Sequence, residues 1–249
     1  MIRLLACCCL LLGGVFSAAA SSMEALAPVM ESAVLYHDFA RGESDPLIGA
    51  FNGRLTSGAE IVAAKEGKAL RTRGGGVLET HDDLPDLTRP GSLSFWVSPR
   101  GWEWGDERPY NRLLSFSGAE GASIQITRVG LLRRPGEAVA RLDRLLLLFH
   151  RLPGEAANRH ISLGATDETT WVDGSWHLFV LSWNGAAWSL SVDAGPPKRI
   201  SLSRPLDADT LDRFALGGSE EPTLFRHLAL YRKELNEEEI ATLYQHQHP

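Results

Sequence analysis

Short apolar runs recur from Ala33 onward, and clusters of glycine, proline, asparagine or aspartate separate them. Runs of about four to eight residues at such close spacing are typical of antiparallel sheets. A parallel sheet would need helical patterns between its strands, and the chain has no such patterns. The spacing therefore predicts an all-β domain, built as a two-sheet antiparallel sandwich with a short C-terminal helix.

The predicted strands cover residues 34–39, 69–72, 76–79, 92–97, 112–117, 123–129, 142–150, 160–163, 176–183, 188–193, 199–202, 213–216 and 225–231. The clearest pair flanks Asn184-Gly185, a dipeptide that favours a tight hairpin turn. In the second arm Trp188, Leu190 and Val192 alternate with polar residues, which predicts one buried face. The first arm is apolar on both faces, so we expect it to be buried on both sides.

One helix is predicted near the C-terminus, after Leu235. Asn236 is a good N-cap, and Glu239 three residues later completes a capping box. Ile240, Leu243 and Tyr244 fall on one side of this helix, which predicts that this side docks on the sandwich.

The first twenty residues read as a secretory signal. Arg3 precedes an apolar run, and small residues at Ala18–Ala20 suit a signal peptidase. The run is short for a membrane anchor, and Leu4-Leu5-Ala6-Cys7 leaves too little apolar chain for a lipoprotein signal. We therefore expect residues 1–20 to be cleaved, 21–32 to be a short lead-in and 33–249 to be one domain.

Export would leave a mature chain without cysteine, because all three cysteines lie in the signal at Cys7–Cys9. Such a chain has no disulfide and depends on its apolar core. The formal net charge of −6 argues against a nucleic-acid partner. We expect no stable membrane span in the mature chain, and a periplasmic or extracellular destination.

Several motifs together resemble a known family. They are Gly67-Lys68-Ala69-Leu70, the strand Gly91–Val97, the hairpin from Asp173-Gly174-Ser175-Trp176-His177 to Val192-Asp193, and Leu216-Gly217-Gly218 followed by Leu228–Leu235 and Glu238-Glu239-Ile240. In order and spacing they are similar to laminin G-like jelly-roll domains of the concanavalin A-like lectin/glucanase superfamily. The resemblance implies a jelly roll over nearly all of the mature chain.

The resemblance leaves function open, because that superfamily includes lectins, adhesion modules, calcium-dependent binding domains and glycoside hydrolases. Two positions depart from the family pattern. Ala194 stands where the family usually has glycine after Val-Asp. The segment Phe225-Arg226-His227 lacks the acidic residue that the family often carries there, so no calcium ligand is carried over.

A hydrolase of this fold would need two carboxylates on one strand at alternate positions. The cluster 103–107 contains Gly105 and has the wrong spacing, and the cluster 79–83 runs off a strand end. Both are typical of solvated loops. Asp82, Asp83 and Asp86 leave open a calcium site of loop oxygens, without a contiguous motif to define it.

The tryptophans fall into two groups. Those in strand patterns are predicted to pack in the core: Trp96, Trp176, Trp183 and Trp188. Trp102 and Trp104 lie in a polar, glycine-containing loop that suits sugar stacking or a protein contact. We expect the ligand site there, with planes from Trp102, Trp104 and Tyr110 and rim contacts from Glu103, Asp106 and Arg108. The alternative is that these aromatics fold back over the sandwich edge.

The sequence thus favours a non-catalytic binding or adhesion module over an enzyme, with a glycan or a cell-surface protein as partner. Two alternatives stay open: a polysaccharide-cleaving hydrolase with a divergent carboxylate pair, and a structural accessory domain without a ligand of its own.

Overall fold

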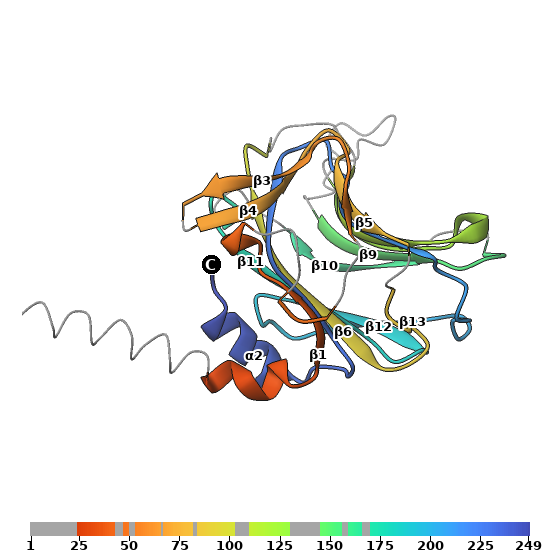
Figure 1. Ribbon diagram of the computed structural model, residues 1–249. Helices are drawn as coiled ribbons and strands as arrows, with labels where there is room; N and C mark the ends of the chain where they lie inside the picture. The colour runs from red at the N-terminus through yellow and green to blue at the C-terminus, as the bar shows by residue number, and fades with distance from the viewer. Residues whose placement is uncertain are drawn as a thin grey trace, which may run out of the picture.

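The computed structural model describes residues 24–42, 47–49, 53–65, 67–81, 84–102, 110–129, 145–155, 159–165 and 170–249. Within these ranges the chain forms two antiparallel sheets that face each other, as expected for a jelly-roll-like sandwich (Figure 1). The eight-stranded sheet is called sheet A, and the seven-stranded one is called sheet B.

The strands of sheet A are, in spatial order, β13 (Lys198–Ser201), β12 (Ala187–Val192), β11 (His177–Trp183), β6 (Gly91–Pro99), β15 (Thr223–Tyr231), β4 (Gly67–Thr72) and β3 (Ala59–Ala64), with β1 (Ala33–His37) also paired to β15. Those of sheet B are β10 (Arg159–Ala165), β9 (Leu145–Arg151), β8 (Ser123–Val129), β7 (Tyr110–Ser117), β14 (Arg213–Gly217), β5 (Val77–Thr80) and β2 (Arg54–Leu55). Two short 3-10 turns, η1 (Phe39–Arg41) and η2 (Ala119–Gly121), lie between strands.

Every predicted strand overlaps an observed one, so the sandwich prediction is confirmed. Two strands were not predicted. β2 is only two residues long and exposed. β3 is the edge strand of sheet A, and its side chains are exposed or half-buried, so its sequence lacks the strict alternation of a strand with one buried face.

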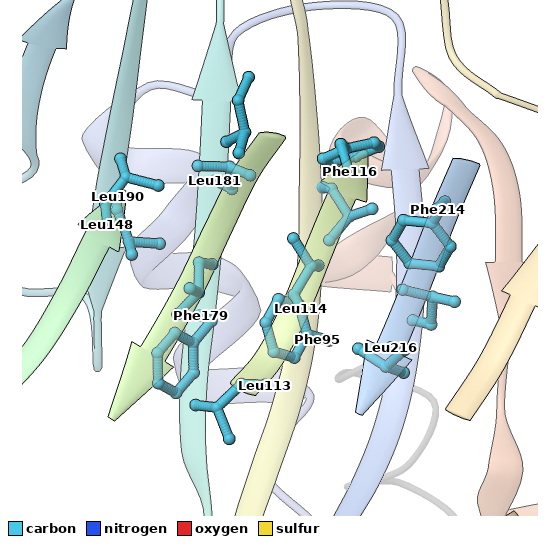
Figure 2. Close-up of a cluster of buried hydrophobic side chains, with 14 of the residues drawn as sticks. Phe95, Leu113, Leu114, Phe116, Leu148, Phe179, Leu181, Leu190, Phe214 and Leu216 are labelled. Carbon is cyan, nitrogen blue, oxygen red and sulfur yellow. The ribbon is translucent and has the colours of Figure 1, made fainter. Parts of the chain in front are cut away.

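The main core lies between the two sheets. Figure 2 shows Phe95, Phe179 and Leu181 of sheet A pointing toward Leu114, Phe116 and Phe214 of sheet B. The rings of Phe95 and Phe179, from neighbouring strands β6 and β11, stack with their centroids 5.3 Å apart. Trp188 and Leu190 also face this core, which confirms the inward face predicted for β12.

The opposite face of sheet A carries a second apolar cluster, made by Trp96, Leu178, Val180, Ala229 and Tyr231. Every residue of β11 is buried, which confirms the prediction of a strand covered on both sides. Two helices supply the outer cover, and they lie side by side in Figure 1.

One of these helices is α2 (Glu237–His246), which packs with Ile240 and Leu243. Its capping box is present as predicted, with Asn236 Oδ1 accepting from the Glu239 amide at 2.9 Å. The other helix, at 24–30, was not predicted; it lies in the expected lead-in and packs with Leu26 and Val29. Neither helix is long and apolar enough to cross a membrane.

The turn after β12 is strained. Asp193 and Ala194 both have positive φ angles, 52° and 56°, and the Gly195 amide closes the turn on the Val192 carbonyl at 2.9 Å. A side chain in the left-handed region costs about 1–2 kcal/mol, and glycine avoids that cost. Alanine thus replaces the family's usual glycine at a position where the left-handed backbone favours glycine.

We expect Ala194→Gly to stabilise the domain by about 0.5–1 kcal/mol, because glycine relieves the left-handed strain. The measurement is the free energy of unfolding in urea. Ala186→Gly is the matched control, since Ala186 is an exposed turn residue without a positive φ, and there glycine should destabilise slightly. Equal effects of the two substitutions would contradict the explanation.

Candidate functional site

Trp102 is not an exposed binding plane. Its side chain is only 4% exposed, and its Nε1 donates to the Pro222 carbonyl at 3.1 Å and to Thr223 Oγ1 at 3.2 Å. The Arg128 guanidinium lies 4.8 Å from its ring centroid, and Trp171 stacks on it at 5.8 Å. The composition of the loop around Trp102 suggested that its side chain would be exposed. These partners instead hold the indole in the core, which is the alternative in which the aromatics fold back over the sandwich edge.

The other residues of the predicted site are not placed. Glu103, Trp104, Asp106 and Arg108 lie outside the described residues, and Tyr110 is described only as the first backbone position of β7. Their role in binding stays a prediction.

Trp176 packs against the second apolar cluster but is less buried than the other strand tryptophans. Its parity places it on the outer face of sheet A with Leu178 and Val180, but it is only half-buried. The guanidinium of the buried Arg226 lies 4.8 Å from its ring centroid. The core packing predicted for Trp176 is thus confirmed in part, and the uncovered part of its side chain lines a pocket.

That pocket, which we call the Trp176 pocket, has a volume of about 590 Å³, within the usual range for small-molecule sites. The residues that line it come from the β3–β4 end of sheet A, the segments beside β6 and β11, and the C-terminal residues: Val62, Ala63, Ala64, Lys65, Arg71, Ser98, Arg100, Gly174, Ser175, Trp176, Leu224, His248 and Pro249. Arg100, which lies three residues before Glu103 in the sequence, is one of these lining residues.

A hydrogen-bond chain fixes the strand end that carries Trp176. His177 Nδ1 lies 2.7 Å from Asp193 Oδ2, and its Nε2 lies 3.0 Å from Ser175 Oγ. These atoms have the order of a hydrolase triad. However, Ser175 Oγ also donates to the Val172 carbonyl at 2.7 Å, and the His177 ring stacks on Trp171 at 3.8 Å. Asp193 Oδ1 further accepts from the Leu178 amide, so we assign this chain to holding the start of β11.

A buried carboxylate joins the two sheets next to Trp102. Glu221, 5% exposed, accepts from Arg128 Nη1 of β8 at 2.9 Å and from the Asn111 amide group of β7. Ser219 Oγ donates to Asn111 Oδ1 at 2.8 Å and accepts from the Glu221 amide at 3.1 Å. The sequence did not single out Glu221, because an isolated acid in a loop carries no local signal of burial.

The carboxylates noted in the sequence do not form a catalytic pair where they are described. Glu79 is held by Arg54 at 2.6 Å, and this hydrogen bond lowers the pKa of Glu79, which opposes a role as a general acid. Asp86 bonds to Thr88 and shares a pocket wall with Asp207, Asp209 and Asp212, while Asp82 and Asp83 lie outside the described residues. Within the described ranges no group of three His, Cys, Asp or Glu side chains is arranged to hold a metal ion, and the calcium site stays a prediction.

No protein-family model and no curated protein matches the chain. Solved structures do match its fold. The binding domain of botulinum neurotoxin serotype D matches with a TM-score of 0.66 at 12% identity, over 87% of this chain and 52% of that one. The binding domain of botulinum neurotoxin DC in complex with SialylT gives 0.63 at 13%, over 86% and 51%.

The binding domain of Paraclostridial Mosquitocidal Protein 1 also matches, with a TM-score of 0.62 at 15% identity, over 86% of this chain and 52% of that one. The chain therefore spans about half the length of these binding domains. At such low identity the likeness shows a shared sandwich fold.

We expect Glu221→Ala to destabilise the domain by about 3–5 kcal/mol, because it leaves the buried Arg128 charge without this partner. Unfolding in urea measures the change. Glu220→Ala is the matched control, since Glu220 is the exposed neighbour and its loss should change stability by less than about 0.5 kcal/mol. Similar losses for the two variants would contradict the assigned role of Glu221.

Proposed function

We propose that the chain is an exported, non-catalytic binding or adhesion module of the laminin G-like type within the concanavalin A-like superfamily, and that its ligand is a glycan on a cell surface. The half-buried Trp176 in its pocket is the observation that carries the proposal. A sugar presents apolar C–H faces and a rim of hydroxyls. An indole face beside guanidinium, hydroxyl and backbone groups matches both.

The architecture around Trp176 suits this task. Arg226 and the hydrogen-bond chain through His177 hold the indole and its strand end before any ligand arrives. A preorganised aromatic loses little conformational entropy on binding, so more of the contact energy appears as affinity. The exposed side chains of Lys65 and Arg100 also line the pocket and can donate hydrogen bonds to sugar hydroxyls.

We further propose that the predicted loop completes the rim of this site. The loop begins beside Arg100, and its side chains Glu103, Trp104, Asp106 and Arg108, with Tyr110, have the chemistry of sugar contacts. Trp102 is excluded from this set, since it is a core residue.

A binding role is favoured over hydrolysis at this site. A glycosidase needs two carboxyl groups flanking the scissile bond. Among the described residues, the side chains that line the Trp176 pocket include no carboxylate, and the acids of the predicted loop have the wrong spacing for a catalytic pair. The structural neighbours support the binding proposal by analogy, since one is in complex with SialylT and another with rat synaptotagmin II.

Export is part of the proposal, and it rests on the sequence of residues 1–20. N-terminal sequencing of the protein from its native host should begin near Ser21. An intact Met1 on protein from a cytosolic fraction would refute export without affecting the binding site.

We expect Trp176→Ala to weaken glycan binding at least tenfold, since a stacked aromatic at a binding hot spot is worth about 2 kcal/mol. The measurement is a glycan array, followed by titration calorimetry with the best sugar. The variant should stay folded, because Trp176 is half-buried and its contact with Arg226 is worth only about 0.5–2 kcal/mol.

Trp102→Ala is the control variant, and the opposite result is expected. It should cost about 3–5 kcal/mol of stability through loss of core packing, and its folded fraction should still bind. An array on which the wild-type protein binds no glycan would contradict the proposed function and favour a protein partner or a structural accessory role. Unchanged binding by folded Trp176→Ala would move the site elsewhere.

A further inference from the structure

The charge of the Trp176 pocket is opposite to that of the chain. The whole sequence carries a formal net charge of −6, yet among the described residues the charged side chains that line the pocket are all cations: Lys65, Arg71 and Arg100. Positive side chains grouped in a concave site attract anions to that site.

Part of this charge is already neutralised. Arg71 Nη2 lies 2.5 Å from Glu60 Oε1, just outside the lining, and this hydrogen bond lowers the pKa of Glu60. Asp173 accepts from the amide of Gly101, the residue after Arg100, at 2.6 Å. Lys65 and Arg100 are exposed, and within the described ranges no salt bridge involves either of them.

A third guanidinium lies against the indole. Arg226 is 2% exposed, its Nε donates to the Lys68 carbonyl at 2.9 Å, and its guanidinium lies 4.8 Å from the centroid of the Trp176 ring. Arg226 thus holds the ring in place, while the exposed cations of the pocket are Lys65 and Arg100.

We infer that the Trp176 pocket selects an anionic sugar, one that carries a carboxylate or a sulfate group. This inference rests on the proposed function, because it takes the indole as the platform for the sugar ring. The ring of the sugar lies on Trp176, and its anionic group lies toward Arg100 and Lys65. A guanidinium matches a carboxylate or sulfate with two parallel hydrogen bonds, which a neutral hydroxyl does not use.

The test compares matched pairs of sugars that differ only in charge. The first pair is 3′-sialyllactose and lactose, which reports on a carboxylate. The second is a heparin hexasaccharide and its fully desulfated form, which reports on sulfate. For at least one pair we expect the anionic sugar to bind at least tenfold more tightly to the wild-type protein, with a preference that falls as sodium chloride rises from about 50 to 500 mM.

The double variant Lys65→Gln, Arg100→Gln should reduce that preference to about twofold or less, while Trp176-dependent binding of the neutral sugar persists. Arg199→Gln is the matched control. Arg199 is an exposed arginine on β13, the strand at the opposite edge of sheet A from β3, and its loss should leave the preference unchanged.

Three results would overturn the inference. Equal wild-type affinity within both sugar pairs, alongside Trp176-dependent binding, removes the charge selection and leaves the proposed function standing. A preference for the anionic sugar that survives in the double variant places the anion outside this pocket. A protein that binds none of these sugars and no glycan on the array loses both the inference and the proposed function.

Discussion

Sheet A is apolar on both faces, and the rest of the molecule follows from the need to cover both. Sheet B covers the inner face and completes the main core. On the outer face, α2 and the helix at 24–30 cover the middle of β6, β11 and β15. This cover ends before Trp176, so the last large apolar side chain of the outer face is left half-buried beside a pocket. The candidate site therefore lies where the helical cover of the outer face ends.

Local signals were enough to predict most of the sandwich. Apolar runs between turn residues located the strands, Asn184-Gly185 located the hairpin, and Asn236 with Glu239 located the start of α2. Trp102 was misassigned, and Trp176 is less buried than expected, because side-chain exposure depends on distant segments. Trp102 is buried by partners that lie far away in the sequence, whereas Trp176 is left open by the limit of a helical cover. Neither the composition of a loop nor the alternation of residues in a strand shows which distant segments will cover a side chain.

Buried polar groups also connect the two sheets and hold the ends of their strands. Glu221 lies just before β15 of sheet A and bonds to residues of β7 and β8 in sheet B. On the other side of Trp171, His177 and Asp193 tie β11 to the turn after β12. The two clusters are linked by the Trp102–Trp171 stack, so the ends of several strands are held together without a disulfide. A rigid frame of this kind suits a site that must be formed before its ligand binds.

Burial on both faces also affects the chain before it has folded. A strand such as β11 has no polar side to show to water, and β9 contains four consecutive leucines followed by phenylalanine. Uncharged segments of this kind pair readily with copies of themselves when exposed, and flanking charges oppose that association. Arg144 and Arg151 bracket the apolar part of β9, and Asp173 and Asp193 lie before and after the hairpin of β11 and β12. Asp193 would thus act twice, as a gatekeeper against aggregation in the unfolded chain and as the partner of His177 in the folded one.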